Sequence, residues 1–327
     1  MAIDEFAIGV DLGGTKIALG IIDQGGRVVE MLRYETDAKG GSGAVIDQIA
    51  RGVKHLESEK GQKLAGIGIG VAGQIDPDTG AVRFAPNLDW HDVPLRADLE
   101  KRTGLPVTVV NDVRGALWGE WLFGAGRGAQ DLVCIFVGTG VGGGIVSHGR
   151  VLEGCSNTAG EIGHMTVSLR GPECTCGNRG CMEAIAGGWA IAKRSRELVA
   201  KHPAAGSAIL KMAGGRAEDI TARVLVQAYY AGESLAREIM DEAAEALAAG
   251  IASLVNAVNP CRIVLGGGII EGMPELVSRV EQGVRRGALA AAQRNLSFSP
   301  SRLGNEAGII GAAALALRLF GKGSAAT

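Results

Sequence analysis

The stretch Phe6–Asp23, FAIGVDLGGTKIALGIID, contains two short apolar segments separated by a glycine turn. A second glycine turn and a third segment follow it. Short apolar segments joined by tight glycine turns are typical of antiparallel strands. The sequence therefore predicts a three-stranded meander, and after it a helix and a buried strand that returns parallel to the first. The predicted ranges are Phe6–Asp11, Ile17–Ile22 and Arg27–Tyr34 for the meander, 44–60 for the helix and Leu64–Val71 for the returning strand.

The same order of elements returns about 127 residues later. A strand is predicted at Leu132–Val137, a glycine turn at Gly138–Gly144, a second strand at Ile145–Ser147 and a third from Arg150 to Leu152. Two unrelated hairpins would give the same local pattern. The repeated order favours two similar α/β domains that face a cleft.

Two further strands are predicted to end in polar or glycine-rich residues. The strand Leu105–Val110 runs into Asn111-Asp112, with a helix expected at Val113–Phe123. The strand Cys261–Leu265 runs into Gly266-Gly267-Gly268. The chain between Cys181 and Asn259 is expected to be mostly helical, with a final helix at Gly308–Phe320 and a frayed tail after it.

The composition excludes several classes of protein. Hydrophobic residues make up 46% of the 327 residues and the formal net charge is -2, which argues against a disordered chain and against a general nucleic-acid binder. The chain has no long uncharged apolar run and no basic, apolar leader at its start, so we expect a cytoplasmic protein without a membrane span. Glycine is the outlier, at 52 residues, against a usual share of about 7%.

Glycine turns at strand ends suit the binding of nucleotide phosphates. Phosphates need backbone N–H donors at close range, and side chains would obstruct that approach. The turn Asp11–Lys16 adds a carboxylate suited to hydrated Mg²⁺. It matches neither the P-loop nor the dinucleotide-binding pattern. A single such turn is equally compatible with a purely structural role, but three of them indicate a nucleotide site.

Three cysteines within eight residues suggest a metal centre. Cys174, Cys176 and Cys181 are preceded by His164, and three thiolates with one imidazole suit tetrahedral Zn²⁺. Because protein ligands would fill all four positions, the zinc is expected to be structural. The alternative is a set of ordinary reduced thiols. We expect Cys134, Cys155 and Cys261 to be packing residues.

Asp112 is the candidate catalytic base. It follows a strand at the edge where α/β folds place their ligands, and phosphoryl transfer to a hydroxyl needs one carboxylate to accept the proton. The alternative is structural, because an Asn-Asp pair before a helix is also a good N-cap.

These motifs together resemble a known superfamily. Asp11–Lys16, Gly138–Gly144 and Leu265–Gly268 look like the phosphate-1, phosphate-2 and adenosine motifs of the actin/hexokinase/Hsp70 ATPases. More narrowly, the chain resembles the ROK family of bacterial sugar kinases and repressors, whose signature matches Gly163-His164-Met165 and Cys174–Glu183. The resemblance implies a two-domain actin-like (duplicated ribonuclease H-like) fold with an interdomain cleft. We expect a smaller domain at 1–113 plus 309–327 and a larger one at 114–308 that carries the zinc site.

The resemblance also implies roles for individual residues. Asp112 would be the general base, and His164 would bind zinc through one ring nitrogen and the sugar through the other. Trp90 is expected to pack in the core rather than stack on a sugar, and His55, His91, His148 and His202 are expected on the surface. The sugar contacts would come from Asn87, Asn111, Asp112, Glu161, His164 and Glu183. ATP would be bound by Asp11, Gly13, Gly14, Thr15, Lys16, Gly138, Thr139, Gly140, Gly142, Gly266, Gly267 and Gly268. The zinc ligands would be His164, Cys174, Cys176 and Cys181.

The sequence departs from the family pattern in three places. Asn111-Asp112 is followed by Val113-Arg114 where relatives often have Ala-Asn, and Ala72 replaces a common proline. The stretch 154–159, GCSNTA, also differs from the usual version. Arg114 could pair with a carboxylate, contact phosphate or contact a substituent of the sugar. These departures leave the chemistry credible and the sugar open.

The function implied is an ATP-dependent hexose kinase with Mg²⁺ and structural Zn²⁺, acting on a primary hydroxyl, with glucose the leading sugar. N-acetylglucosamine, N-acetylmannosamine or fructose are alternative substrates. A sugar-sensing repressor of the same family is a second reading, and we expect no DNA-binding domain because Phe6 already opens the first strand. A zinc hydrolase is disfavoured because the zinc would be fully ligated. Family members imply a homodimer or homotetramer.

Overall fold

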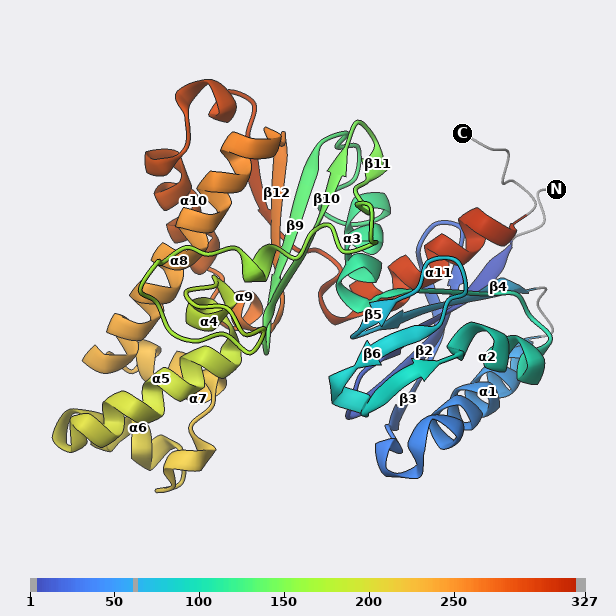
Figure 1. Cartoon of the computed structure of the whole chain (residues 1–327), viewed down its shortest axis with the longest axis horizontal. Helices are drawn as coiled ribbons and strands as arrows, with labels where there is room; N and C mark the ends of the chain where they lie inside the picture. Colours follow the sequence, from blue (N-terminus) through green and yellow to red (C-terminus); the bar gives the residue numbers. More distant parts are fainter. Residues whose placement is uncertain (1–4, 61–63, 322–327) are drawn as a thin grey trace. The chain divides into compact units, whose positions relative to one another are not determined.

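The computed structural model describes residues 5–60 and 64–321, so the predicted fraying of 322–327 lies outside the described residues. The chain forms two compact units, which Figure 1 shows and which are described separately below. Unit 1 contains the chain up to Gly128, the short segment Glu153–Ala159 and the chain from Asn305 onward. Unit 2 contains Ala129–Leu152 and Gly160–Gly304.

Unit 1 is built on a five-stranded sheet in the order β3-β2-β1-β4-β8. The first three strands form the predicted antiparallel meander, and β4 and β8 run parallel to β1. The strands are β1 (Phe6–Leu12), β2 (Lys16–Asp23), β3 (Val28–Glu35), β4 (Leu64–Val71) and β8 (Val107–Asn111).

The two faces of this sheet differ in side-chain size. In β4, Ile67 and Ile69 are fully buried in the core that also contains the apolar face of α1 (Gly41–Lys60). Successive side chains of a strand point to opposite faces, so the glycines between them face the other side. There the final helix α11 (Ala307–Phe320) lies so close that a Cβ on Gly68 would be 1.8 Å from the carbonyl oxygen of Ala312. Figure 1 shows α1 and α11 on opposite sides of the sheet.

Unit 2 repeats the arrangement of unit 1. Its sheet has the order β11-β10-β9-β12-β13, with an antiparallel meander and two strands parallel to β9. The predicted internal repeat is confirmed. The strands are β9 (Leu132–Val137), β10 (Val141–Ser147), β11 (Arg150–Val151), β12 (Arg262–Gly266) and β13 (Ser297–Pro300).

Helices of unit 2 pack on its sheet around a second hydrophobic core. The longest, α8, contributes a row of buried alanines and larger apolar residues to this core. Among the described residues, no helix combines the length and apolar character that a bilayer span requires. The helices are α4 (Glu183–Ala186), α5 (Gly188–Lys201), α6 (Pro203–Met212), α7 (Ala222–Tyr230), α8 (Ser234–Val258), α9 (Gly268–Gly272) and α10 (Leu276–Gly287).

Some elements were mispredicted or missed. The glycine turn after β9 is shorter than the predicted Gly138–Gly144, because β10 begins at Val141 and pairs Gly142 with Phe136. Unit 1 also contains a three-stranded sheet, β5 (Gln74–Ile75), β6 (Val82–Ala85) and β7 (Trp90–Val93), and the helix α2 (Leu95–Thr103), none of which the sequence analysis identified.

The unit boundaries also differ from the predicted domain boundaries. A division after residue 113 would cut helix α3 (Asp112–Leu122) near its start. Instead the whole of α3 packs on α11, and Gly115 and Gly119 of α3 lie directly against the backbone of Gly311. Unit 1 therefore continues to Gly128 and resumes at Asn305.

The contact between α3 and α11 gives the first prediction. A Cβ at position 311 would be 1.8 Å from the carbonyl oxygen of Gly115, and no rotamer change can relieve a clash with backbone. We expect Gly311→Ala to lower the free energy of unfolding by about 3 kcal/mol or more, measured by urea denaturation. The control is Gly43→Ala in α1, where an added Cβ meets nothing within 4 Å and should stabilise the helix by roughly 0.5–1 kcal/mol. Equal effects of the two substitutions would contradict the packing described.

Candidate active site and metal centre

Asp11 lies near the carboxyl end of β1, on the face of the sheet covered by α11. Gly308, in the first turn of α11, is so close that an added Cβ would be 3.5 Å from the carboxyl carbon of Asp11. Burial, and to a smaller extent the negative charge of Asp112, raise the pKa of the Asp11 carboxyl to about 6. The carboxylates of Asp11 and Asp112 therefore lie close enough to repel each other, and a divalent cation bound there would relieve this repulsion.

Asp112 is the first residue of α3, directly after β8. The helix cap is Asn111, whose side-chain oxygen accepts hydrogen bonds from the backbone N–H groups of Val113 (3.1 Å) and Arg114 (3.2 Å). The side chain that caps this helix is therefore that of Asn111, not that of Asp112. The amide nitrogen of Asn111 donates to the carbonyl of Gly73 at 3.3 Å, so both ends of this side chain have protein partners.

The first glycine turn joins β1 to β2. Gly13 N–H donates to the carbonyl of Lys16 at 3.0 Å, and the Thr36 hydroxyl donates to the carbonyl of Gly13 at 2.7 Å. A Cβ on Gly14 would be 2.4 Å from the carbonyl oxygen of Asn87. The turn therefore lies against Asn87, which is exposed, as are Thr15 and Lys16. Unit 1 thus brings a predicted sugar ligand next to a predicted phosphate turn.

The second glycine turn follows β9 and is fixed to the start of α5. The N–H groups of Gly188 and Trp189 donate to the carbonyls of Gly138 and Thr139, both at 2.9 Å. An added Cβ at Gly138 meets nothing within 4 Å, so packing within the chain does not explain the glycine there. Space beside the backbone is what a bound phosphate would need.

Glu183 supports this turn from α4. One carboxylate oxygen accepts a hydrogen bond from the N–H of Val141 at 2.8 Å, and the other accepts one from the indole N–H of Trp189 at 3.3 Å. A carboxylate oxygen can accept two hydrogen bonds, so these contacts leave capacity for a hydroxyl. The link between Glu183 and Trp189 was missed in the sequence, where a lone tryptophan at the start of a helix gives no signal of it.

The third glycine turn follows β12. Gly267 has φ of +90° and lies against the backbone of Val137, so only glycine fits. Gly268 is exposed and an added Cβ there meets nothing within 4 Å. It begins α9, a helix that the sequence analysis did not predict.

Glu161 lies between Gly160 and Gly163, whose backbone packs closely against β10. A Cβ on Gly163 would be 1.9 Å from the carbonyl of Val141, and one on Gly160, at φ of +95°, would be 3.1 Å from the carbonyl of Gly143. The Glu161 side chain between them is exposed. The close approach of the backbone therefore fixes the position of an accessible carboxylate.

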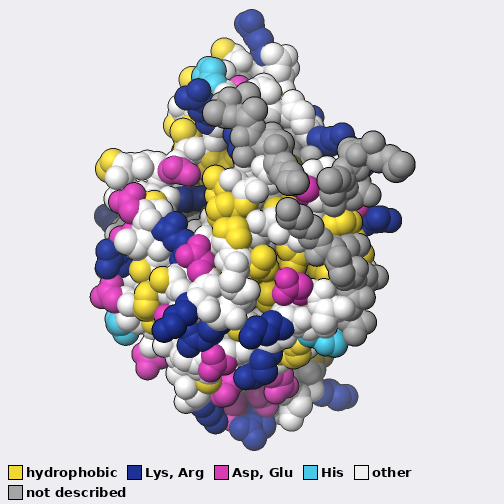
Figure 2. Space-filling view, turned by 90° about the vertical axis from the view of Figure 1, so that its right-hand side faces the viewer, with side chains coloured by type: hydrophobic (Ala, Val, Ile, Leu, Met, Phe, Trp, Pro, Cys, Tyr) yellow, Lys and Arg dark blue, Asp and Glu magenta, His cyan; other side chains and the backbone are white. Residues whose placement is uncertain are grey.

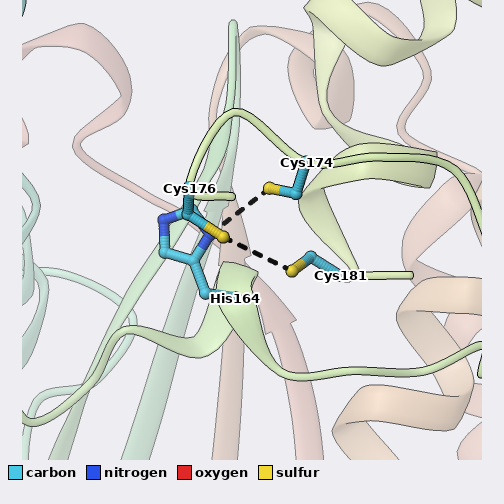
Figure 3. Close-up of side chains that lie close together, drawn as sticks. All are labelled: His164, Cys174, Cys176 and Cys181. Atoms are coloured by element: carbon cyan, nitrogen blue, oxygen red, sulfur yellow. Dashed lines mark hydrogen bonds between the residues drawn. The ribbon is translucent and has the colours of Figure 1, made fainter. Parts of the chain in front are cut away.

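His164, Cys174, Cys176 and Cys181 come together in unit 2, as Figure 3 shows. Their ligand atoms all lie within 4.8 Å of one another. Cys176 Sγ and Cys181 Sγ are 3.7 Å apart, and Cys174 Sγ is 3.6 Å from His164 Nδ1. Two sulfurs bound tetrahedrally at about 2.3 Å from zinc would be ~3.8 Å apart, so the residues fit a metal of this type. Since Nδ1 faces the thiols, Nε2 of His164 is available for another partner.

The thiols differ in their electrostatic setting. Burial, together with the neighbouring Cys174 and Cys176, raises the pKa of the Cys181 thiol to about 12. The backbone N–H of Asn178 lowers the pKa of the Cys176 thiol. A buried thiolate next to two others needs a cation to stabilise it, and a metal would supply that charge.

The burial predicted for Trp90, for four histidines and for two of three further cysteines agrees with the structure. Trp90 is 2% exposed and packs in the core of unit 1, and His55, His91, His148 and His202 are exposed, as predicted. Cys134 is buried and Cys261 is half-buried. The expectation for Cys155 was wrong, because this side chain is exposed in a segment without apolar neighbours to cover it.

Comparison with known proteins defines the class of protein. The ROK family profile matches residues 7–319, and the chain belongs to this family. It is 38% identical to a glucokinase of Thermotoga maritima over 94% of this chain and 96% of that one. A ROK glucokinase from Streptomyces griseus, solved with glucose and AMPPNP, is 34% identical and has a TM-score of 0.82, covering 95% of this chain and 98% of that chain. A xylose repressor of Caldicellulosiruptor bescii is 30% identical over 95% of this chain and 77% of that protein. The two-domain actin-like fold expected from the sequence is confirmed.

The raised pKa of Asp11 gives the second prediction. A carboxyl that binds its proton more tightly in the folded state lowers stability as the pH rises from 3.8 to about 6, and the full loss is present above that. Asp11→Asn should therefore stabilise the protein at pH 7.5 by roughly 2–3 kcal/mol, and the gain should shrink at pH 4.5. Thermal unfolding at both pH values measures this, with the exposed Asp78→Asn as the control. A gain that is equal at both pH values would contradict the assignment.

Proposed function

We propose that this protein is an ATP-dependent hexose kinase that transfers the γ-phosphate to a primary hydroxyl of glucose. The observation that carries the proposal is the pair Asp11 and Asp112, which unit 1 places near each other at the carboxyl ends of its parallel strands. Similarity to glucokinases over nearly the whole chain points in the same direction.

Asp112 is proposed as the general base. It is the first residue of α3, so its carboxylate lies at the helix N-terminus, directly after β8. In the proposed mechanism Asp112 takes the proton of the sugar hydroxyl as the hydroxyl oxygen attacks the γ-phosphorus, the bond from the γ-phosphorus to the β,γ-bridging oxygen breaks, and ADP leaves. Asn87 and Asn111 in unit 1 and Glu161, Glu183 and His164 in unit 2 are the proposed sugar ligands.

The glycine turns are proposed to hold ATP. Backbone N–H groups at Gly13, Gly14, Thr15, Gly138, Thr139 and Gly140 would donate to phosphate oxygens, with Lys16 adding a positive charge. The turn Gly266–Gly268 would contact the adenosine. Asp11 would hold Mg²⁺, whose chemistry is to neutralise charge on the phosphates. Gly142 lies in β10, where it pairs with Phe136, rather than in the turn.

Zinc is the metal proposed for the cluster of His164 and the three cysteines. With four protein ligands, its role would be to hold the chain around Glu183 and His164 in place. Because three reduced thiolates are needed, we propose a cytoplasmic location, where thiols stay reduced.

We also propose that the protein is a homodimer or a homotetramer, as expected from family members. Light scattering in solution tests this proposal.

A repressor function is less well supported than a kinase function. The family contains repressors as well as kinases, but identity to the repressor is 30% and to glucokinases up to 38%. On the face shown in Figure 2, basic and acidic side chains are intermixed, which gives no support to phosphate-backbone binding. Other hexoses, including N-acetylglucosamine, N-acetylmannosamine and fructose, remain alternative substrates within the same reaction class.

The assignment of the base gives the third prediction. Asp112→Asn keeps the size of the side chain and the cap at Asn111 but removes the proton acceptor. We expect kcat with glucose and ATP to fall by about 10³-fold or more, while glucose binding measured by calorimetry stays within a few fold of the parent. Turnover near the parent rate would remove Asp112 from the role of base.

The metal assignment gives the fourth prediction. Cys176→Ser should lower the zinc content from about one ion per chain and lower the melting temperature together, because a ligand and the charge balance of the site are lost. The matched control is Cys155→Ser, an exposed cysteine outside the cluster, which should change neither. A Cys176→Ser protein that keeps its zinc and its melting temperature would contradict a structural zinc site.

A further inference from the structure

Two of the departures from the family pattern lie in contact in the structure. The guanidinium of Arg114, on α3, donates to the side-chain oxygen of Asn157, to the carbonyl of Asn157 at 3.0 Å and to the carbonyl of Ala159 at 3.4 Å. Asn157 in turn donates from its amide nitrogen to the carbonyl of Ile75 at 3.3 Å. We call this pair, Arg114 and Asn157, the clasp.

The clasp holds a segment that has little else to hold it. Residues 153–156 and Thr158 are exposed, and only Asn157 and Ala159 are half-buried. The segment contributes no residue to the hydrophobic core of unit 1, although it belongs to that unit while the chain on either side of it belongs to unit 2. Its place in unit 1 therefore depends on polar contacts, of which those to Arg114 are the most numerous.

The chemistry of both residues suits the contact. Asn157 has φ of +58°, a left-handed conformation that asparagine tolerates better than most residues. Arg114 is half-buried and offers a planar fork of donors that can bind two acceptors of one residue at once, which lysine cannot do. Asparagine therefore suits the backbone conformation at position 157, and arginine suits its two acceptors.

We propose that Arg114 is a positioning residue for sugar binding, which acts by holding the segment Glu153–Ala159 and so ordering the approach to Glu161. This inference rests on the proposed function, in which Glu161 contacts the sugar. In this role Arg114 acts through its hydrogen bonds to Asn157 and Ala159. Without the clasp, part of the free energy of sugar binding would be spent on ordering the segment, and the apparent affinity would fall in proportion to the ordered fraction.

The test is a double-mutant cycle with Arg114→Met, Asn157→Gly and the combined variant. Arg114→Met keeps the length of the side chain without its donors, and Asn157→Gly removes the amide without strain at a positive φ. We expect each single change to raise KM for glucose about ten-fold with kcat within about three-fold, and the double variant to be no worse than the poorer single one. Arg114→Lys should recover part of the loss in KM.

The matched control is Arg96→Met. Arg96 is also a half-buried arginine of unit 1 that donates to backbone carbonyls, those of Asp78 and Thr79, but it holds a different turn. It should lower the melting temperature without changing KM. A KM within two-fold of the parent in Arg114→Met, or a double variant whose KM rises by the product of the single effects, would overturn the proposal.

Hydrogen exchange separates this proposal from the proposed function. Amides in 153–159 should exchange faster in Arg114→Met and Asn157→Gly than in the parent or in Arg96→Met, whether or not the protein phosphorylates glucose. If the parent protein phosphorylates no hexose, the proposed function fails while the exchange result still judges the clasp. If the parent is active and exchange in 153–159 is unchanged in both variants, the clasp is wrong and the function stands.

Discussion

The close approach of α11 to the sheet of unit 1 is the constraint on which the site depends. Gly9 and Gly68 present no side chain to α11, so the helix backbone lies directly on β1 and β4. The same helix meets α3 through Gly311. Because α11 begins beside Asp11 and α3 begins at Asp112, this packing brings the two carboxylates near each other. Larger residues at these glycines would separate the helices from the sheet and the carboxylates from one another.

This packing also changes the interpretation of the glycine excess. From the sequence, the glycine excess was linked to strand-end turns that would bind phosphate. The alternation in Leu64–Val71 was visible, but a sequence does not show what lies against the small face of a strand. Some turn glycines, such as Gly267, are demanded by backbone contacts, whereas Gly138 and Gly268 have open space beside them. Packing therefore does not explain the glycines at Gly138 and Gly268.

Much of the fold was predictable because its strands are short, apolar and bounded by glycine. Leu64–Val71 and Leu132–Val137 were predicted with the bounds observed, and the repeated meander was identified from its order. The small sheet β5-β6-β7 was missed because its strands have two to four residues and mixed polarity. The proximity of His164 to the three cysteines was predictable from their residue types, their spacing and the family signature. The contact between Arg114 and Asn157, 43 residues apart, was not, since nothing local links them.

The kinase assignment rests on similarity to glucokinases and on the residues proposed to bind phosphate and sugar and to accept the proton. The choice of sugar rests on similarity alone. The most direct test is a coupled assay of ADP release by the purified protein with ATP and Mg²⁺ across glucose, N-acetylglucosamine, N-acetylmannosamine, mannose, fructose and allose. The account predicts that glucose gives the highest kcat/KM of the set. ADP release that no hexose raises above the rate without sugar would contradict it.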